Sequence, residues 1–223
     1  MYLLRSQVGR KIVMAVSGFS MLAFVVVHLL GNTSMYGGPG SMNAYASALH
    51  RFPLLIWLFR LILMVMFYLH VFYGIALKLE NRDAKPEPYV VEKYKQSTFA
   101  GRNMIWTGLL IGAFVVYHLL HFTFQVTNPQ ISAGSHPDAM GRPDVFMMVM
   151  LSFRKLAISA VYISAMIVLG LHLSHSIQSG FQTVGLNNDR SFPIAIKGGM
   201  VVAILITLGF AAFPIVIFTG ILR

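Results

Sequence analysis

Four histidines stand out for the chemistry they could do, because each lies inside a different long apolar segment. They are His28, His70, His118 and His172. An imidazole can bind a metal ion or transfer a proton, and an ionisable group inside a membrane usually serves a function because burying it there is costly. A single such histidine could also be a hydrogen-bonded packing residue. The arrangement of all four therefore has to decide between these interpretations.

The composition of this 223-residue chain is that of an integral membrane protein. Hydrophobic residues make up 57% of it, charged residues only 11%, and the mean hydropathy is strongly positive. Five apolar stretches approach or exceed the roughly 20 residues that a spanning helix needs. We expect an all-α bundle of five transmembrane helices, in one domain over residues 1–223. The expected helices cover residues 12–31, 53–79, 103–126, 150–178 and 194–222, and the first lacks a signal-peptide cleavage pattern, so we expect it to be retained.

Basic residues are distributed unevenly between the segments that connect these stretches. One side receives Arg5, Arg10, Lys11, Lys78, Arg82, Lys85, Lys93, Lys95, Arg102, Arg190 and Lys197. The other side receives Arg51, Arg60, Arg142, Arg154, Lys155 and Arg223. The positive-inside rule then places the N-terminus in the cytoplasm and the C-terminus outside. The formal charge of +10 reflects this topology, and no motif supports binding of nucleic acid.

This topology places the four histidines at two depths. Helices one and three run outward, so His28 and His118 lie in the outer half of the membrane. Helices two and four run inward, so His70 and His172 lie in the inner half. The helical rise of about 1.5 Å per residue staggers the two levels by roughly the span of a macrocycle. Two imidazoles at each level are typical of two stacked haems b, each bound by two histidines.

Other uses of buried histidines fit the sequence less well. A di-iron bundle needs inward-facing glutamates, whereas all seven acidic residues lie in predicted loops. These are Glu80, Asp83, Glu87, Glu92, Asp138, Asp144 and Asp189. Cysteine is absent and no glycine-rich phosphate-binding loop is present. Iron–sulfur or flavin chemistry would therefore have to belong to another chain.

A repeated pattern in the first and third helices supports the haem interpretation. Ser17-Gly18 precedes His28, and Thr107-Gly108 precedes His118, at identical spacing. Eleven residues make about three helical turns, so each hydroxyl residue shares a face with its histidine but lies about 16 Å nearer the cytoplasm. That is the level of the inner haem, where the glycines would leave room for a porphyrin edge. Ordinary small-residue helix contacts would explain the glycines equally well.

Several short motifs occur along nearly the whole chain. They are Gly9-Arg10-Lys11, Ser17-Gly18, His28-Leu29-Leu30-Gly31-Asn32, Asn43-Ala44-Tyr45, Tyr73-Gly74, Tyr117-His118, Leu171-His172-Leu173-Ser174-His175 and Phe181-Gln182-Thr183-Val184-Gly185. Together they resemble the di-haem cytochrome b subunit that anchors succinate:quinone oxidoreductases and fumarate reductases of the single-anchor, five-helix type. The resemblance implies His70 and His172 as ligands of the proximal haem iron, and His28 and His118 as ligands of the distal one. The topology gives the same pairs.

The resemblance also implies a function and a set of partners. The chain would be a multi-pass subunit of a respiratory enzyme complex in the inner, cytoplasmic membrane, bound on its cytoplasmic face to a flavoprotein and an iron–sulfur subunit. It would pass electrons between the iron–sulfur subunit and a membrane quinone, menaquinone or ubiquinone, without itself acting on succinate. Six-coordinate iron has no open position for oxygen, so the haems would only transfer electrons.

Further residues are candidates for roles around the two haems. Arg60, at an outer helix end, could neutralise the propionates of the distal haem. His121 and His175 each follow a proposed ligand by three residues and are therefore rival ligands. A quinone site near the outer haem would draw on Asn32, Asn43, Tyr45, His50, Arg51 and His121, of which His50 and His121 are the leading candidates.

Two other functions remain open. One is a haem b anchor that links a different dehydrogenase or a hydrogenase to quinone. The other is a haem-free membrane transporter with packing histidines, which would be colourless after purification.

Overall fold

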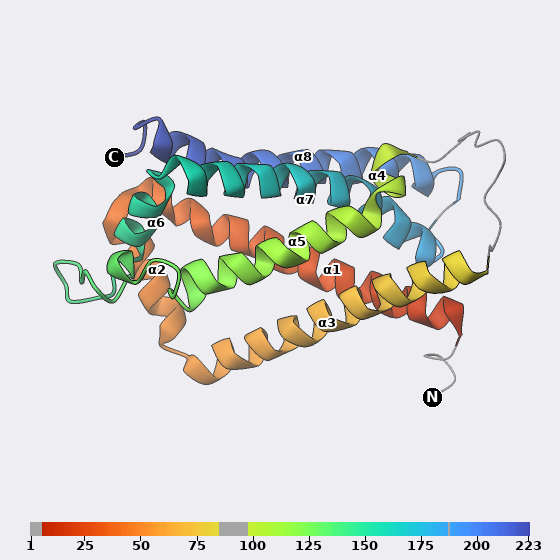
Figure 1. The fold of residues 1–223 in the computed structure, drawn as a ribbon, viewed down its shortest axis with the longest axis horizontal. Coiled ribbons are helices and arrows are strands. Elements are labelled where there is room, and N and C mark those ends of the chain that lie inside the picture. The colour runs from red at the N-terminus through yellow and green to blue at the C-terminus, as the bar shows by residue number, and fades with distance from the viewer. Residues whose placement is uncertain (1–5, 85–97, 187) are drawn as a thin grey trace.

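The computed structural model describes residues 6–84, 98–186 and 188–223 (Figure 1). Throughout these ranges the regular secondary structure is helical, apart from one isolated bridge between Pro137 and Pro143. Several charged residues of the topology and acidic-residue arguments lie outside the described residues, namely Arg5, Lys85, Glu87, Glu92, Lys93 and Lys95.

Five helices are long and apolar enough to cross a membrane. They are α1 (Gln7–Asn32), α3 (Pro53–Asp83), α5 (Met104–His118) together with the π-helical turn η3 (Leu119–Thr123) that continues it, α7 (Leu156–Thr183) and α8 (Ser191–Phe218). Large apolar side chains such as Leu54 and Trp57 are exposed along these helices, as expected where lipid rather than water surrounds a protein. The expected all-α bundle of five long apolar helices is therefore confirmed, and these helices are candidate membrane spans.

The five helices run side by side along the long axis of the molecule (Figure 1). The most extensive contact joins α7 and α8, and the next joins α1 and α3. Helix α1 also packs against α7, α7 packs against α5, and α5 packs against α3. The helices α1, α3, α5 and α7 therefore form a four-helix bundle. All four predicted ligand histidines come from these four helices, while α8 packs against α7 from outside.

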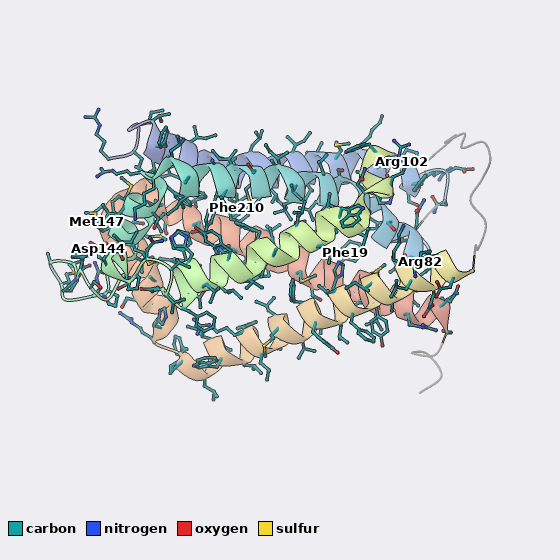
Figure 2. All side chains as sticks on the ribbon, viewed as in Figure 1. Phe19, Arg82, Arg102, Asp144, Met147 and Phe210 are labelled. Carbon is teal, nitrogen blue, oxygen red and sulfur yellow. The ribbon has the colours of Figure 1, made fainter. Side chains whose placement is uncertain are left out.

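The two ends of the bundle differ in their secondary structure. The N-terminal end, as we name it, contains the start of α1, the end of α3, the short helix α4 (Phe99–Arg102) and the start of α8 (Figure 1). Arg82 and Arg102 lie there, while Asp144 lies at the opposite end (Figure 2). An ion pair between Arg10 and Glu80 joins α1 to α3 at the N-terminal end.

Short helices close the opposite end, which we name the C-terminal end. They are η2 (Thr33–Gly37), α2 (Gly38–His50), η4 (Pro129–Ile131) and α6 (Val145–Phe153). Buried apolar residues of η2, α2, α6, α7 and α8 form a common core there, including Met35, Met150, Tyr162 and Ile217. This core fixes the ends of α7 and α8 relative to the connecting segments.

Several expected boundaries differ from the structure. The second long helix continues to Asp83, so Glu80 and Asp83 lie in a helix rather than in the expected loop. Residues 36–41, expected to be a loop, include the start of α2, where a proline occupies one of the first two helical positions. The expected helix over residues 150–178 is two helices, because Lys155 is extended and separates α6 from α7. The last helix ends at Phe218 rather than at residue 222, and Gly220 beyond it has a positive φ of 74°.

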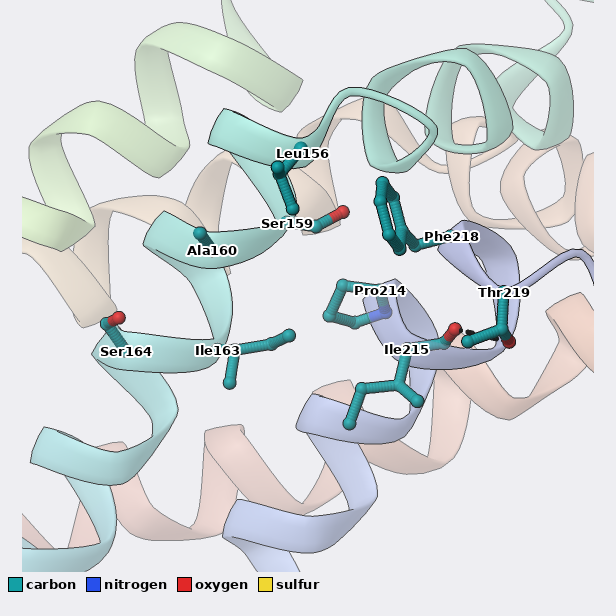
Figure 3. A pocket seen from close by; sticks show the side chains of 9 residues that line it. All are labelled: Leu156, Ser159, Ala160, Ile163, Ser164, Pro214, Ile215, Phe218 and Thr219. Carbon is teal, nitrogen blue, oxygen red and sulfur yellow. Dashed lines mark hydrogen bonds between the residues drawn. The ribbon is translucent and has the colours of Figure 1, made fainter.

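An apolar groove of about 340 Å³ lies between α7 and α8 near the C-terminal end (Figure 3). Pro214, inside α8, lines it together with Ile163 and Phe218. Proline has no N–H to donate and its ring disturbs the preceding turn, so the helix surface is irregular here. None of the predicted site residues lines this groove.

Candidate functional site

The four long apolar helices bring the histidines together in two pairs. The ring centres of His28 on α1 and His118 on α5 are 5.9 Å apart. Those of His70 on α3 and His172 on α7 are 6.3 Å apart. A bond from a metal ion to an imidazole nitrogen is about 2 Å, so two imidazoles on opposite sides of one ion have ring centres roughly 6 Å apart. Each pair therefore has the separation that two ligands of one metal ion require.

The pairs lie at two levels that can be measured along α1 and α5. A Cβ atom added to Gly18 would lie 3.1 Å from Cε1 of His70. One added to Gly108 would lie 3.4 Å from Cε1 of His172. His28 and His118 each follow these glycines by ten residues, or about 15 Å of helix. Two independent helices thus give the same spacing between the levels.

The two glycines, expected to leave room for a porphyrin edge, each lie against a histidine ring. At each of them the missing side chain leaves space for an imidazole ring of the pair at the N-terminal end. Gly18 is tighter than Gly108, since 3.1 Å is shorter than an ordinary van der Waals contact. The glycines therefore allow α1 to approach His70 on α3, and α5 to approach His172 on α7.

A backbone hydrogen bond sets the tautomer of His70. Its Nδ1 is 3.1 Å from the carbonyl oxygen of Met14. A carbonyl only accepts, so Nδ1 carries the hydrogen and the lone pair is on Nε2. Ser17, which is buried, donates to the same Met14 oxygen at 3.0 Å. The ring of His70 is thereby held with Nε2 available for a metal ion.

The equivalent bond of His172 goes to a side chain. Its Nδ1 is 3.2 Å from Oγ1 of Thr107. The Thr107 hydroxyl lies within 3.2 Å of the carbonyl oxygens of Asn103 and Met104 and donates its hydrogen to them. It can then only accept from His172, whose Nε2 is left with the lone pair. Hydrogen bonds of this kind orient metal-binding histidines.

The pair nearer the C-terminal end has aromatic surroundings. The ring of His28 is 5.4 Å from that of Phe24 and 5.8 Å from that of Phe210. Nδ1 of His118 is 3.3 Å from the hydroxyl of Tyr162 on α7. Asn32, a predicted quinone residue, donates to the carbonyl oxygen of His28 at 2.7 Å and so lies beside this pair.

The rival ligands have different neighbours. The described ring contacts of His121 are with Tyr117, Phe122 and Tyr162 rather than with another imidazole. Nδ1 of His175 accepts from the amide nitrogen of Gln178 at 3.0 Å, and the ring lies against Gly101 of α4. Within the described part of the chain, facing imidazoles therefore occur at His118 and His172 and not at these two positions.

Arg60 is not in contact with the histidine pairs among the described residues. Its side chain is exposed, and its guanidinium carbon lies 5.0 Å from the centre of the Trp57 ring, one turn earlier in α3. Such a cation–π contact, about two turns from the start of α3, suits a residue near the membrane interface.

Asn43 belongs to a polar network that holds the C-terminal end together. Its amide donates to Asp144 at 3.0 Å and accepts from the backbone N–H of Phe146 at 3.0 Å. Its side chain is also 3.4 Å from Asp138. The hydrogen bond from the Arg142 side chain lowers the pKa of Asp138 to about 2. Asn43 is therefore engaged in joining α2 to α6, which leaves it little capacity for a ligand.

The other predicted quinone residues are dispersed. Tyr45 is exposed, and its hydroxyl lies directly against Gly31. His50 is exposed at the end of α2, where its Nδ1 is 2.8 Å from the carbonyl oxygen of Ala46, and Arg51 follows it. Of the six candidates, Asn32 is hydrogen-bonded to His28, and His121 is linked to His118 through the hydroxyl of Tyr162.

Sequence reasoning missed Tyr162. It is buried on α7, and its hydroxyl lies between His118 and His121. A signal was available, because Tyr162 precedes His172 by the same ten residues that separate the two levels on α1 and α5. A tyrosine at that depth on the fourth span faces the level of His118.

Groups of three or more histidine, aspartate and glutamate side chains that could hold a metal ion do not occur among the described residues. The two pairs of facing imidazoles are therefore the candidate metal-binding groups among the described residues. Comparisons with protein-family models, with curated proteins and with solved structures found no match.

Proposed function

We propose that this chain is the di-haem membrane anchor of a succinate:quinone oxidoreductase or quinol:fumarate reductase. It would pass electrons between an iron–sulfur subunit and a membrane quinone. The observation that carries the proposal is the geometry of the two histidine pairs, which come from four helices and lie about 15 Å apart along the bundle. The motifs that resemble this family support the choice of enzyme.

The residues at both levels fit a bis-histidine haem b. When bound, such a haem supplies one-electron transfer and leaves no coordination position open. His70 and His172 present Nε2 because Met14 and Thr107 accept from their Nδ1 atoms. Such bonds also raise the basicity of the ligand, which strengthens its bond to iron. Neutral imidazoles among apolar side chains avoid the cost of placing charge inside a membrane.

The proposal assigns different partners to the two ends of the bundle. The basic residues of the N-terminal end, including Arg82, Arg102 and Lys197, favour the cytoplasmic side by the positive-inside rule. The iron–sulfur and flavoprotein subunits would bind there, next to the His70–His172 pair. Quinone would bind at the opposite end, where Asn32 and His121 lie beside the His28–His118 pair.

The test is a reduced-minus-oxidised visible spectrum with a haem-to-protein ratio for the complex purified from its own membranes. We expect two haems b per chain. Alanine at any one of His28, His70, His118 or His172 should remove one haem, because the partner histidine alone does not hold iron at six coordination. His175→Ala is the matched control and should retain both haems.

The identity of the copurifying subunits tests the rest of the proposal. We expect succinate to reduce the haems, or fumarate to oxidise them. A colourless protein would instead indicate the transporter alternative. Haems that respond to hydrogen or formate, but not to succinate or fumarate, would indicate the anchor of another enzyme.

A further inference from the structure

Tyr162 connects two histidines that belong to the same helical segment. Its hydroxyl is 3.3 Å from Nδ1 of His118 and 2.9 Å from Nδ1 of His121. The tyrosine ring is held in place by edge-on contacts with Phe114 and Phe153, each at 5.0 Å between ring centres. The side chain is 6% exposed, so these hydrogen bonds form away from the surface.

His118, Tyr162 and His121 form a chain of two hydrogen bonds. If His118 binds iron as proposed above, the donors and acceptors in this chain are fixed. A His118 that uses Nε2 for the metal carries its hydrogen on Nδ1 and donates it to the Tyr162 oxygen. The Tyr162 hydroxyl then has to donate its own hydrogen to Nδ1 of His121. A neutral imidazole has one N–H, so His121 carries it on Nε2.

That N–H is buried without a partner. His121 is 3% exposed, and its Nε2 has no hydrogen-bond partner among the described residues. Buried donors of this kind are rare and call for an acceptor. His121 also lies in the π-helical turn η3, an element that occurs frequently at functional sites.

The surroundings of His121 indicate the chemistry of that acceptor. The ring of Phe122 lies 4.1 Å from that of His121, and the ring of Tyr117 lies 5.5 Å away. Aromatic surfaces next to a single donor suit a flat, conjugated, uncharged ligand with an acceptor oxygen. A quinone carbonyl has these properties.

We propose that Tyr162 is a positioning residue for His118 and His121, and that Nε2–H of His121 donates to a carbonyl oxygen of quinone bound beside the His28–His118 pair. The inference rests on the proposed function, because the direction of the hydrogen-bond chain depends on iron at His118. It selects His121 from the six residues that the sequence offers for quinone binding.

The first arm of the test uses Tyr162→Phe, with Tyr117→Phe as the matched control. Both changes remove one hydroxyl, but among the described hydrogen bonds only that of Tyr162 reaches a histidine. The midpoint potential of each haem is titrated in the purified, haem-containing protein. We expect Tyr162→Phe to raise the potential of one haem, because an imidazole whose N–H lacks an acceptor donates less charge to iron. Tyr117→Phe should leave both potentials unchanged.

The second arm compares His121→Ala with His121→Gln. The amide nitrogen of glutamine can replace Nε2 as a donor, whereas alanine cannot. The rate of haem reduction by decyl-ubiquinol is followed by stopped flow as a function of quinol concentration. We expect alanine to raise the concentration for half-maximal rate about ten-fold or more, and glutamine to raise it less than about three-fold.

The outcomes separate this inference from the proposed function. A wild-type protein without haem would overturn both. Two haems whose potentials are unchanged in Tyr162→Phe would overturn the positioning role of Tyr162 and leave the proposed function intact. An unchanged quinol dependence in His121→Ala would overturn the assignment of His121 as the quinone donor, and a buried water would then be its partner.

Discussion

Three of the four predicted ligand histidines have a hydrogen-bond acceptor at Nδ1, which would leave Nε2 for a metal ion. For His70 the acceptor is a backbone carbonyl, which substitution of a side chain cannot remove. For His172 it is the hydroxyl of Thr107, and for His118 it is the hydroxyl of Tyr162. Side-chain acceptors can be removed one at a time. Removal of a single hydroxyl oxygen can therefore change the hydrogen bonding of one histidine pair without changing that of the other.

Thr107→Val should weaken haem binding at the level of His172. Valine has nearly the same shape as threonine, but it lacks the oxygen that accepts from Nδ1 of His172. Loss of such a partner typically costs about 10- to 100-fold in metal affinity or activity. Thr107→Ser keeps the oxygen and is the control. Haem retention during dilution or haem competition would measure the effect, and equal retention in both variants would contradict the role given to Thr107.

The sequence could predict which histidine rings meet, but not the contacts that orient them. Depths follow from topology and helical rise, and the rings paired by that argument do lie close together. That they bind iron stays a prediction. The bond between Tyr162 and His118 joins residues 44 positions apart on different helices, and nothing local in the chain specifies it. Arg60 shows the same limit, since its contact with Trp57 depends on side-chain conformation rather than on depth.

At the scale of helices, α7 and α8 pack closely because Gly170 on α7 lies opposite the hydroxyl of Thr207 on α8. Thr207 on α8 donates to the carbonyl oxygen of Ala203 at 2.8 Å and lies 3.4 Å from that of Met166 on α7. A Cβ on Gly170 would overlap Oγ1 of Thr207. Small residues bring membrane helices close enough for such contacts, since lipid gives no hydrophobic drive for helices to associate.

Gly170→Ala should destabilise the protein by forcing α7 and α8 apart. Overpacking of this kind costs about 1–3 kcal/mol. Adding Thr207→Ala removes the overlapping oxygen and should restore part of the loss. Gly198→Ala, on α8 with no atom within 4 Å of the new Cβ, is the control and should leave stability unchanged or slightly raised. Unfolding in detergent measures all three, and equal stability of Gly170→Ala and Gly198→Ala would show that the helices do not approach as closely as described.

The sequence pattern predicts the spanning helices but not all of the points at which helices begin and end. The five spans follow from apolar length, which a membrane makes a strict requirement. No glycine or proline at Lys155 indicates that the chain divides into α6 and α7 there. A buried hydrogen bond from Ser159 to the carbonyl oxygen of Phe153 is found at this break. The π-helical turn at Leu119–Thr123 is likewise a tertiary feature, in which His121 meets Tyr162.

At the scale of the whole molecule, the two ends differ in the number of basic residues and in the histidine pair that each holds nearby. More of the lysines and arginines belong to the N-terminal end, near the His70–His172 pair. At the C-terminal end, carboxylates such as Asp138 and Asp144 take part in the hydrogen-bond network around Asn43, near the His28–His118 pair. If the N-terminal end is cytoplasmic, electrons that pass between succinate and quinone also move across the membrane. The orientation of the bundle therefore determines whether the proposed reaction separates charge.

Single cysteines would establish this orientation, because the chain contains no cysteine of its own. Ala139→Cys lies in the exposed loop at the C-terminal end, and Asp189→Cys lies in the exposed segment before α8 at the other end. We expect a membrane-impermeant maleimide to label Ala139→Cys in intact cells, and Asp189→Cys only after the membrane is opened. This follows from the positive-inside rule, since Arg190 and Lys197 flank position 189. The reverse labelling would place quinone on the cytoplasmic side and the partner subunits outside, which is incompatible with the proposed complex even if both haems are present.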